Sequence, residues 1–314
     1  MKLFPYSIIC MNEEAILGVK LSDLMEKQGN ACSATELAAL AAAFRLEMFE
    51  VLRQRQTGHW GGSSSAAELV TALYYNRLNI RPEDPRWEDR DRFILSKGHA
   101  TINLYTILAH RGYFSPKELP GFRTLDSFLQ GHPNMNTVPG VDFSAGALGH
   151  GVSAATGMAL AARLGNKKYW TYVMTGEGCL DEGQTWEALL FAAKYKPRGL
   201  VLMVDYNKVQ LDGPSQEILP LDPLADKLVS FGWHVAPEAY NGHKTEEILA
   251  SFKWMDSDES WPKAVIYNTI KAKGISFMEG KAVWHGSPID DESYAKGRQE
   301  LLLDIENKEA LLWL

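Results

Sequence analysis

The chain has 314 residues and 46% hydrophobic content, which is enough to bury a substantial core, and one large α/β domain is favoured over two small ones. Its formal net charge of −7 and its lack of any Lys/Arg-rich run argue against a nucleic-acid-binding surface. An anionic substrate would have to be bound by positive groups gathered at its own site. No run of eighteen apolar residues occurs, so we expect no membrane-spanning helix and no membrane partner.

The cysteines point to a reducing compartment. Cys10, Cys32 and Cys179 are widely spaced and odd in number, which fits reduced thiols in a cytoplasmic protein better than a disulfide framework or a metal cluster. The segment Leu3–Met11 has some apolar character, but Pro5 interrupts it, so we do not expect a signal peptide.

The first part of the chain is predicted to be mainly helical. We expect residues 1–34 to form a leader and residues 35–314 to form the domain. Ser33 or Thr35 can cap a helix over residues 36–55. Glycines then break the pattern, and one of the serines at 63–65 is expected to cap a second helix that reaches about residue 77.

Strands and helices alternate in the rest of the chain. Apolar runs at 170–174 and 199–204 flank a helix over about 181–194, and continuous apolarity indicates a parallel sheet covered on both faces. Further strands are expected at 92–96, 232–235 and 264–269, and further helices at 101–110, 152–164, 223–230, 245–252 and about 290–303. We therefore predict an α/β fold with a mostly parallel sheet flanked by helices.

Two polar residues follow the two central strands. Glu177 and Asn207 can face one ligand because the carboxyl ends of parallel strands meet at the same edge of a sheet. Gly176 and Gly178 let a diphosphate approach the backbone, and the helix amino terminus that follows favours its negative charge. A carboxylate and a carboxamide suit Mg²⁺, although an exposed glutamate in an ordinary glycine turn is the open alternative.

Six of the eight histidines have a glycine neighbour, which is more than random placement of 26 glycines would give. An imidazole on such a turn can donate to phosphate or carbonyl oxygens and change its charge near neutral pH, although any single one also fits a surface loop. The six are His59, His99, His132, His150, His243 and His285.

Taken in order, these motifs resemble the transketolase family of thiamine diphosphate enzymes. The stretch G-E-G-C-L-D-E-G at 176–183 is similar to the family's G-D-G-x-x-x-E-G, with Glu177 in place of the aspartate, which affects metal choice or affinity. The loops T-G-H at 57–59, L-S-K-G-H-A at 95–100, G-H-P at 131–133, G-A-L-G-H-G at 146–151 and W-H-G at 284–286 also follow the family's order. His150 stands where the family has glutamine, and its role stays unassigned.

The resemblance implies a set of site residues. Thiamine diphosphate would be contacted by His99, Gly146, Leu148, Gly176, Gly178, Glu182, Asn207 and His285, with Glu182 at an interface between two active centres. Glu177, Asn207 and the backbone carbonyl of Val209 would bind Mg²⁺, or Ca²⁺ or Mn²⁺ in its place. The catalytic residues that line the donor-sugar site would be His59, His132 and His285.

The resemblance covers only the first half of single-chain transketolases. The second domain, whose glutamate activates the cofactor in this family, is missing from the match. The chain therefore resembles the N-terminal subunit of a split transketolase, and its partner would be a C-terminal subunit, in a heterotetramer of two chains of each kind. The implied reaction moves a two-carbon ketol unit from a ketose to an aldose, with sugar phosphates as substrates.

Two alternatives stay open. The α subunit of a thiamine-dependent 2-oxoacid dehydrogenase carries a similar metal motif in a chain of similar size, although the L-S-x-G-H-A and G-H-P stretches speak against it. A non-catalytic metal-diphosphate binding module would explain Glu177 and the missing half. His110, His234 and His243 match no motif and are expected to be structural or surface groups.

Overall fold

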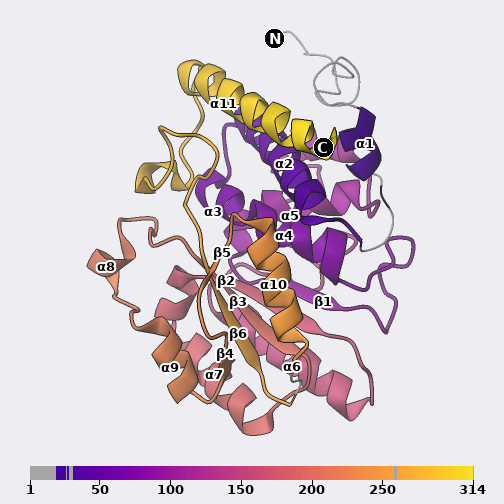
Figure 1. The fold of residues 1–314 in the computed structure, drawn as a ribbon, viewed down its shortest axis with the longest axis vertical. Coiled ribbons are helices and arrows are strands. Elements are labelled where there is room, and N and C mark those ends of the chain that lie inside the picture. Colours follow the sequence, from indigo (N-terminus) through magenta and orange to yellow (C-terminus); the bar gives the residue numbers. More distant parts are fainter. Residues whose placement is uncertain (1–18, 26, 28–30, 258–259, 314) are drawn as a thin grey trace.

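A parallel sheet lies between two layers of helices (Figure 1). The computed structural model describes residues 19–25, 27, 31–257 and 260–313. The strands lie in the order β1 (Arg92–Leu95), β2 (Thr171–Gly176), β3 (Leu200–Tyr206), β6 (Lys263–Asn268) and β4 (His234–Val235), and β5 (Tyr240–Asn241) also pairs with β6. All these pairings are parallel, so the predicted α/β fold is confirmed.

Two hydrophobic cores lie on opposite faces of the sheet. The larger one involves α1 (Val19–Met25), α2 (Ala34–Arg55), α4 (Ala67–Ala72), α5 (Thr101–His110), α10 (Thr245–Met255) and α11 (Asp291–Ala310). The smaller one involves α6 (His150–Leu164), α7 (Gly183–Tyr195) and α9 (Leu224–Ser230). Within β3, Val201 belongs to the first core and Leu202 to the second, which is why the strand is apolar at successive positions.

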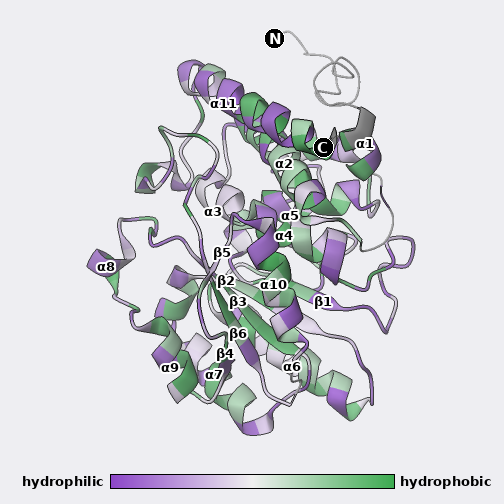
Figure 2. Cartoon of the chain, viewed as in Figure 1, coloured by the Kyte–Doolittle hydropathy of each residue, from purple (hydrophilic) through white to green (hydrophobic). Residues whose placement is uncertain are grey.

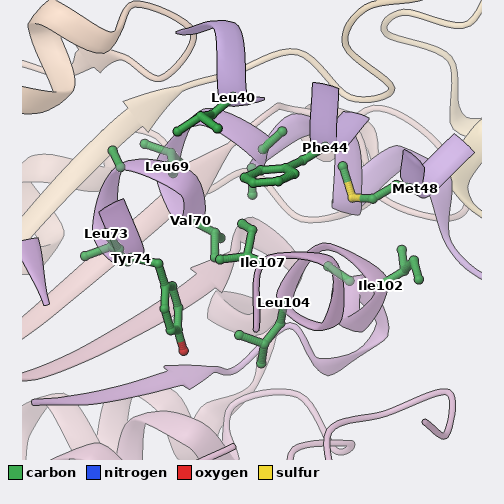
Figure 3. Close-up of a cluster of buried hydrophobic side chains, with 14 of the residues drawn as sticks. Leu40, Phe44, Met48, Leu69, Val70, Leu73, Tyr74, Ile102, Leu104 and Ile107 are labelled. Carbon is green, nitrogen blue, oxygen red and sulfur yellow. The ribbon is translucent and has the colours of Figure 1, made fainter. Parts of the chain in front are cut away.

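The colouring by hydropathy follows these layers. Figure 2 shows hydrophobic strands at the centre of the molecule, whereas the outlying α11 carries many hydrophilic residues. In the larger core, Leu40 and Phe44 of α2 pack with Leu69 and Val70 of α4 and Ile107 of α5, as Figure 3 shows. All five are fully buried. This packing holds the helices that precede the sheet firmly on one of its faces.

The start of the domain differs in part from its prediction. Ser33 caps α2 as expected, because its hydroxyl accepts from the backbone of Glu36 and the Glu36 carboxylate accepts from the backbone of Ser33. The next helix was predicted to begin at one of the serines at 63–65, and this is wrong. It begins at Trp60 as α3 (Trp60–Ser65), and a π-helical turn at Leu73–Arg77 ends the helical stretch after α4.

The serines do not cap this helix because their hydroxyls bond elsewhere. Ser63 Oγ donates to the carbonyl of His59 at 2.6 Å, and Ser65 Oγ donates to Asp205 Oδ2 at 2.6 Å. The two glycines at the start of α3 serve close packing instead. A Cβ at Gly61 would lie 2.9 Å from Cε of Lys271, so this end of the helix approaches the strand edge more closely than an alanine would allow.

Part of the predicted leader joins the fold. Leu21 and Leu24 of α1 are buried in the larger core. Cys10 and the segment Leu3–Met11 lie outside the described residues. Cys32 and Cys179 are free buried thiols. No helix in the described ranges combines the length and the apolar character needed to cross a membrane.

Two glycines of α6 give a matched test of this packing. A Cβ at Gly151 would lie 2.6 Å from Ser96 Cβ and 2.9 Å from Ile94 Cγ2, whereas a Cβ at Gly157 meets nothing within 4 Å. We expect Gly151→Ala to lower the free energy of unfolding by about 1–3 kcal/mol through overpacking. Gly157→Ala should raise it by about 0.5–1 kcal/mol because alanine is the better helix former. Denaturant unfolding of both variants tests this, and equal stabilities would contradict the close approach.

Candidate functional site

Four strands deliver polar side chains to one edge of the sheet. Lys97 follows β1, Glu177 follows β2, Asn207 follows β3 and Lys271 follows β6. All four line a cavity of about 260 Å³. Glu177 and Asn207 were predicted for the site from the sequence, and the same cavity is lined by seven further residues with such a prediction, namely His99, Gly146, Leu148, Gly176, Gly178, Val209 and His285. The parallel topology thus brings together residues that lie far apart in the sequence.

Glu177 is the carboxylate at the centre of this edge. It is 2% exposed and begins a 3₁₀ turn directly after β2. Its Oε2 accepts from the backbone N–H of Asn207 at 3.1 Å, and its Oε1 accepts from Ser215 Oγ at 3.0 Å. Burial, and then the charge of Asp205, raises the pKa of Glu177. A carboxylate has about four lone-pair positions, so these two bonds leave room for a cation.

Lys271 places a cation beside the expected metal ligands. Its Nζ donates to the carbonyls of Val209 at 3.1 Å and Gln210 at 2.8 Å. It also lies 2.8 Å from Nδ1 of His285, which accepts this bond. Burial lowers the pKa of Lys271 to about 8, while the nearby charge of Glu177 opposes the shift. At neutral pH the ammonium is therefore still mostly protonated and can face an anion.

A buried ion pair between Lys97 and Asp205 connects the ends of two strands at the site. Lys97 Nζ contacts Asp205 Oδ2 and donates to the carbonyl of Gly62 at 2.6 Å, and neither charged side chain is more than 2% exposed. Burial alone would raise the pKa of Asp205, but the charge of Lys97 and hydrogen bonds, among them those from Ser65 and Thr269, lower it. Both charges are thus compensated inside the protein.

Three histidine rings cluster at the cavity, and two of them, those of His99 and His285, belong to its lining. The ring centroids of His59 and His99 lie 5.3 Å apart, those of His59 and His285 5.3 Å, and those of His99 and His285 5.0 Å. Burial, and next the charge of Arg123, lowers the pKa of His59 to about 4. Burial, with the charge of Lys271 next, lowers the pKa of His285 to about 3. Burial also holds the pKa of His99 well below its usual value. These shifts keep all three rings uncharged near neutral pH, and in His285, whose Nδ1 accepts from Lys271, the other ring nitrogen is a hydrogen-bond donor.

Three predicted site residues lie outside the lining of this cavity. His59 contacts it only through the rings of His99 and His285. His132 is exposed, and its carbonyl accepts a hydrogen bond from Tyr105 Oη at 3.1 Å. Burial and the charge of Arg123 lower the pKa of His132. Glu182 is exposed at the N-cap of α7, where a second protein chain could reach it.

Two of the histidines without a motif are structural. His110 Nε2 lies 2.6 Å from Glu47 Oε2. His243 Nε2 accepts from the backbone N–H of Ile270 at 2.8 Å, so its Nδ1 carries the proton that bonds Glu68 Oε2 at 3.1 Å. The third, His234, is exposed and packs its ring against Trp254.

A larger cavity of about 540 Å³ lies at the opposite edge of the sheet, beside the first residues of β2. Its principal cation, Arg77, bonds both carboxylate oxygens of Asp256 at 2.8 and 2.9 Å. Lys167 pairs with Asp89 at 2.9 Å. Arg77 and Lys167 thus already have carboxylate partners, and Lys168 is the remaining cation in this lining.

Comparison with known proteins agrees with this site. The sequence profile of the family described as "Transketolase, thiamine diphosphate binding domain" matches residues 37–310. The chain belongs to this family. It is 40% identical over 266 residues to the 6-deoxy-6-sulfo-D-fructose transketolase subunit SqwG of Clostridium sp. (strain MSTE9), with 85% of this chain and 96% of that protein covered. It is 36% identical to one of the subunits named for the apulose-4-phosphate transketolase of Phocaeicola vulgatus, with 84% of this chain and 93% of that protein covered.

Full-length transketolases match over less than half of their length. Human transketolase is 34% identical, with 87% of this chain but 43% of that protein covered. The crystal structure of transketolase from Campylobacter jejuni superimposes with a TM-score of 0.80 at 28% identity, covering 88% of this chain and 45% of that one. Since two relatives of matching length are named as transketolase subunits, the prediction of an N-terminal subunit of a split transketolase is confirmed, and the 2-oxoacid dehydrogenase alternative loses its support.

The residues at the carboxyl edge fit thiamine diphosphate and a divalent metal. The carboxylate of Glu177, the carboxamide of Asn207 and the carbonyl of Val209 are hard oxygen donors of the kind that Mg²⁺ prefers. Lys271 supplies positive charge for a diphosphate at the cavity, whereas the charge of Lys97 is paired with Asp205. A Cβ at Gly146 would meet nothing within 4 Å, so this part of the lining leaves space beside the cavity.

Sequence reasoning missed the two lysines of the site. Lys97 lies within the L-S-K-G-H-A motif, and Lys271 follows the last predicted strand, so both positions were marked as strand ends. A lysine by itself does not indicate a functional site, because lysines are common on protein surfaces. The signal that could have identified these two is their position directly after a strand of the parallel sheet. The contacts that give them a function join residues more than 60 positions apart.

Lys271 generates a prediction about cofactor affinity. We expect Lys271→Met to weaken binding of Mg²⁺–thiamine diphosphate roughly 10- to 100-fold, because a charge-assisted contact to the diphosphate is lost. Lys273→Met is the matched control, since Lys273 Nζ bonds Glu279 at 3.0 Å away from the cavity. Isothermal calorimetry of both variants measures the difference. Equal affinities in the two variants would exclude Lys271 from the diphosphate site.

Proposed function

We propose that this chain is the metal- and diphosphate-binding subunit of a two-chain transketolase that acts on anionic sugars, with the site residues in the roles given below. The observation that carries the proposal is the meeting of Glu177, Asn207 and Lys271 at one edge of the sheet, below three neutral histidines. This arrangement supports an oxygen-ligated cation and a diphosphate next to groups that can exchange protons with a sugar.

In this proposal, Glu177, Asn207 and the carbonyl of Val209 hold the metal ion. The cofactor would be contacted by His99, Gly146, Leu148, Gly176, Gly178, Glu182, Asn207 and His285. Thiamine diphosphate, when bound, supplies the electron sink for cleaving the ketose. Lys271 orients His285, because its ammonium donates to Nδ1 and leaves Nε2 of that ring to act on the ligand.

The donor-site histidines are proposed to move protons at the sugar. His59, His132 and His285 serve as uncharged hydrogen-bonding groups, which is supported by the low pKa values of all three. An uncharged imidazole donates a hydrogen bond through one ring nitrogen and can accept one through the other, so His59 and His132 can exchange hydrogen bonds with sugar hydroxyls and His285 can donate through Nε2. The surrounding positive charges of Arg123 and Lys271 favour this uncharged state.

The partner and substrates are proposed from the relatives. One relative is named for a sulfo-sugar and another for a sugar phosphate, so an anionic ketose is the substrate class that we assign. A C-terminal transketolase subunit would complete the site in a heterotetramer of two chains of each kind, in the cytoplasm, with exposed Glu182 at the junction between active centres.

The metal assignment can be tested at Glu177. We expect Glu177→Ala to lower metal-dependent thiamine diphosphate affinity by more than about 100-fold, beyond what loss of a residue that merely orients a ligand costs. Glu177→Asp should keep the affinity or improve it for Mg²⁺, because aspartate retains a carboxylate and is the residue at this position of the family's motif. Calorimetry with Mg²⁺, Ca²⁺ and Mn²⁺ measures the effect, and unchanged affinity in the alanine variant would refute the assignment.

The assembly can be tested with the purified chain. We expect the chain alone to show no ketol transfer at saturating cofactor, and co-expression with a C-terminal transketolase subunit to restore it. A coupled transfer assay together with light scattering measures activity and stoichiometry in the same samples. Full activity of this chain as a monomer would refute the two-chain proposal.

A further inference from the structure

His243 holds the piece of backbone that carries Lys271. It lies in the loop between β5 and α10, and its side chain is 10% exposed. Nε2 of its ring accepts from the backbone N–H of Ile270 at 2.8 Å, directly before Lys271. The loop itself runs close to the end of β6, because a Cβ at Gly242 would lie 2.5 Å from Cγ2 of Thr269. The ring is therefore fixed against the segment that follows β6.

A buried ion pair sets the tautomer of His243. Nδ1 of the ring bonds Glu68 Oε2 at 3.1 Å, and the same oxygen accepts from Arg45 at 2.6 Å. Burial alone would raise the pKa of Glu68, but the charge of Arg45 outweighs burial and lowers this pKa, so the carboxylate stays ionised. An ionised carboxylate keeps the proton on Nδ1 and leaves Nε2 free to accept from Ile270.

The same ion pair also anchors the other side of Lys271. Arg45 Nε donates to Ser64 Oγ at 3.1 Å, and this hydroxyl donates in turn to the backbone carbonyl of Lys273. The backbone is thus held at Ile270, before the lysine, and at Lys273, after it. Both anchors lead back to one arginine in the interior.

The backbone between the two anchors is strained. Ala272 has a φ of 57°, in the left-handed region that a residue with a Cβ adopts at a cost, and its N–H donates to the carbonyl of Gly61 at 3.0 Å. Such a conformation persists where the surrounding contacts enforce it. The adjacent Lys271 is 2% exposed, and its Nζ reaches the carbonyls of Val209 and Gln210. A shift of this backbone would therefore move the ammonium out of its place at the cavity.

We propose that His243 is a positioning residue for cofactor binding, because its bond to Ile270 fixes Lys271 at the diphosphate. The role rests on the diphosphate contact proposed above for Lys271. His243 does not belong to the lining of the cavity, so its effect on the cofactor passes through the backbone. The competing role is to pair with the buried Glu68 and serve stability alone. The two roles use different ring nitrogens, so amide substitutions can separate them.

The test compares two amide variants in the assembled two-chain enzyme. His243→Gln brings its amide near the position of Nε2 and can accept from Ile270, whereas His243→Asn brings it near Nδ1 and can bond only Glu68. We expect His243→Asn to weaken binding of Mg²⁺–thiamine diphosphate roughly 10-fold and His243→Gln to keep most of the affinity, as measured by calorimetry. His110→Asn is the matched control, because His110 also bonds a carboxylate, that of Glu47, and does not line the cavity.

Two further measurements locate the effect. In the Lys271→Met background, His243→Asn should cause little additional loss of affinity, because both substitutions remove the same contact. Hydrogen exchange of peptides that cover residues 268–274 should be faster in His243→Asn than in the parent enzyme or in His243→Gln. The exchange measurement needs no cofactor, so it reports on the position of Lys271 separately from the function of the site.

Several results would overturn the positioning role of His243. These are equal affinities of the two amide variants, additive losses with Lys271→Met, unchanged exchange over residues 268–274, or loss of folding in both amide variants. A parent enzyme that bound no thiamine diphosphate would refute the proposed diphosphate site. Faster exchange confined to His243→Asn would in that case still support the hold of His243 on the segment around Lys271.

Discussion

The buried pair of Lys97 and Asp205 ties together the elements that form the site. Lys97 follows β1, Asp205 lies near the end of β3, Ser65 of α3 donates to the same carboxylate, and Thr269 after β6 bonds its other oxygen. Removing either charge would leave the other uncompensated in the interior, which is far more costly than losing a surface pair. The positions of the strand ends and of α3 therefore depend on one another, and the shape of the cavity that they line depends on this ion pair.

The charges at this edge have separate tasks. Lys271 brings a positive charge to the cavity that Glu177 and Asn207 also line, while the nearby rings of His59 and His285 are uncharged. Both effects have the same origin, because burial and neighbouring cations disfavour a further positive charge on an imidazole. In the roles proposed above, a fixed charge would hold the diphosphate and the uncharged rings would hydrogen-bond the sugar.

The sequence predicted those parts of the molecule that local pattern controls. Continuous apolar runs located β2 and β3, Ser33 marked the start of α2, and Glu177 and Asn207 were expected at one edge because both follow parallel strands. It failed where tertiary contacts decide. The start of α3 was misplaced because the serines bond to Asp205 and to backbone instead of capping, and Gly61 is required by Lys271, a residue 210 positions away that no local pattern connects to it.

The carboxyl edge is also the side on which the site is open. Glu182 is exposed at the start of α7, and Leu211, which lines the cavity, is 60% exposed. The short helix α8 (Ser215–Ile218) that follows carries Ile218, 45% exposed, and is followed by Leu219, 47% exposed. Apolar side chains gathered around a functional cavity are typical of surfaces that another chain covers. We infer that the partner subunit covers this side of the cavity, while the strand ends of this domain carry the charged groups. Loops and the partner chain can then set the substrate class without a change of the sheet that carries the site.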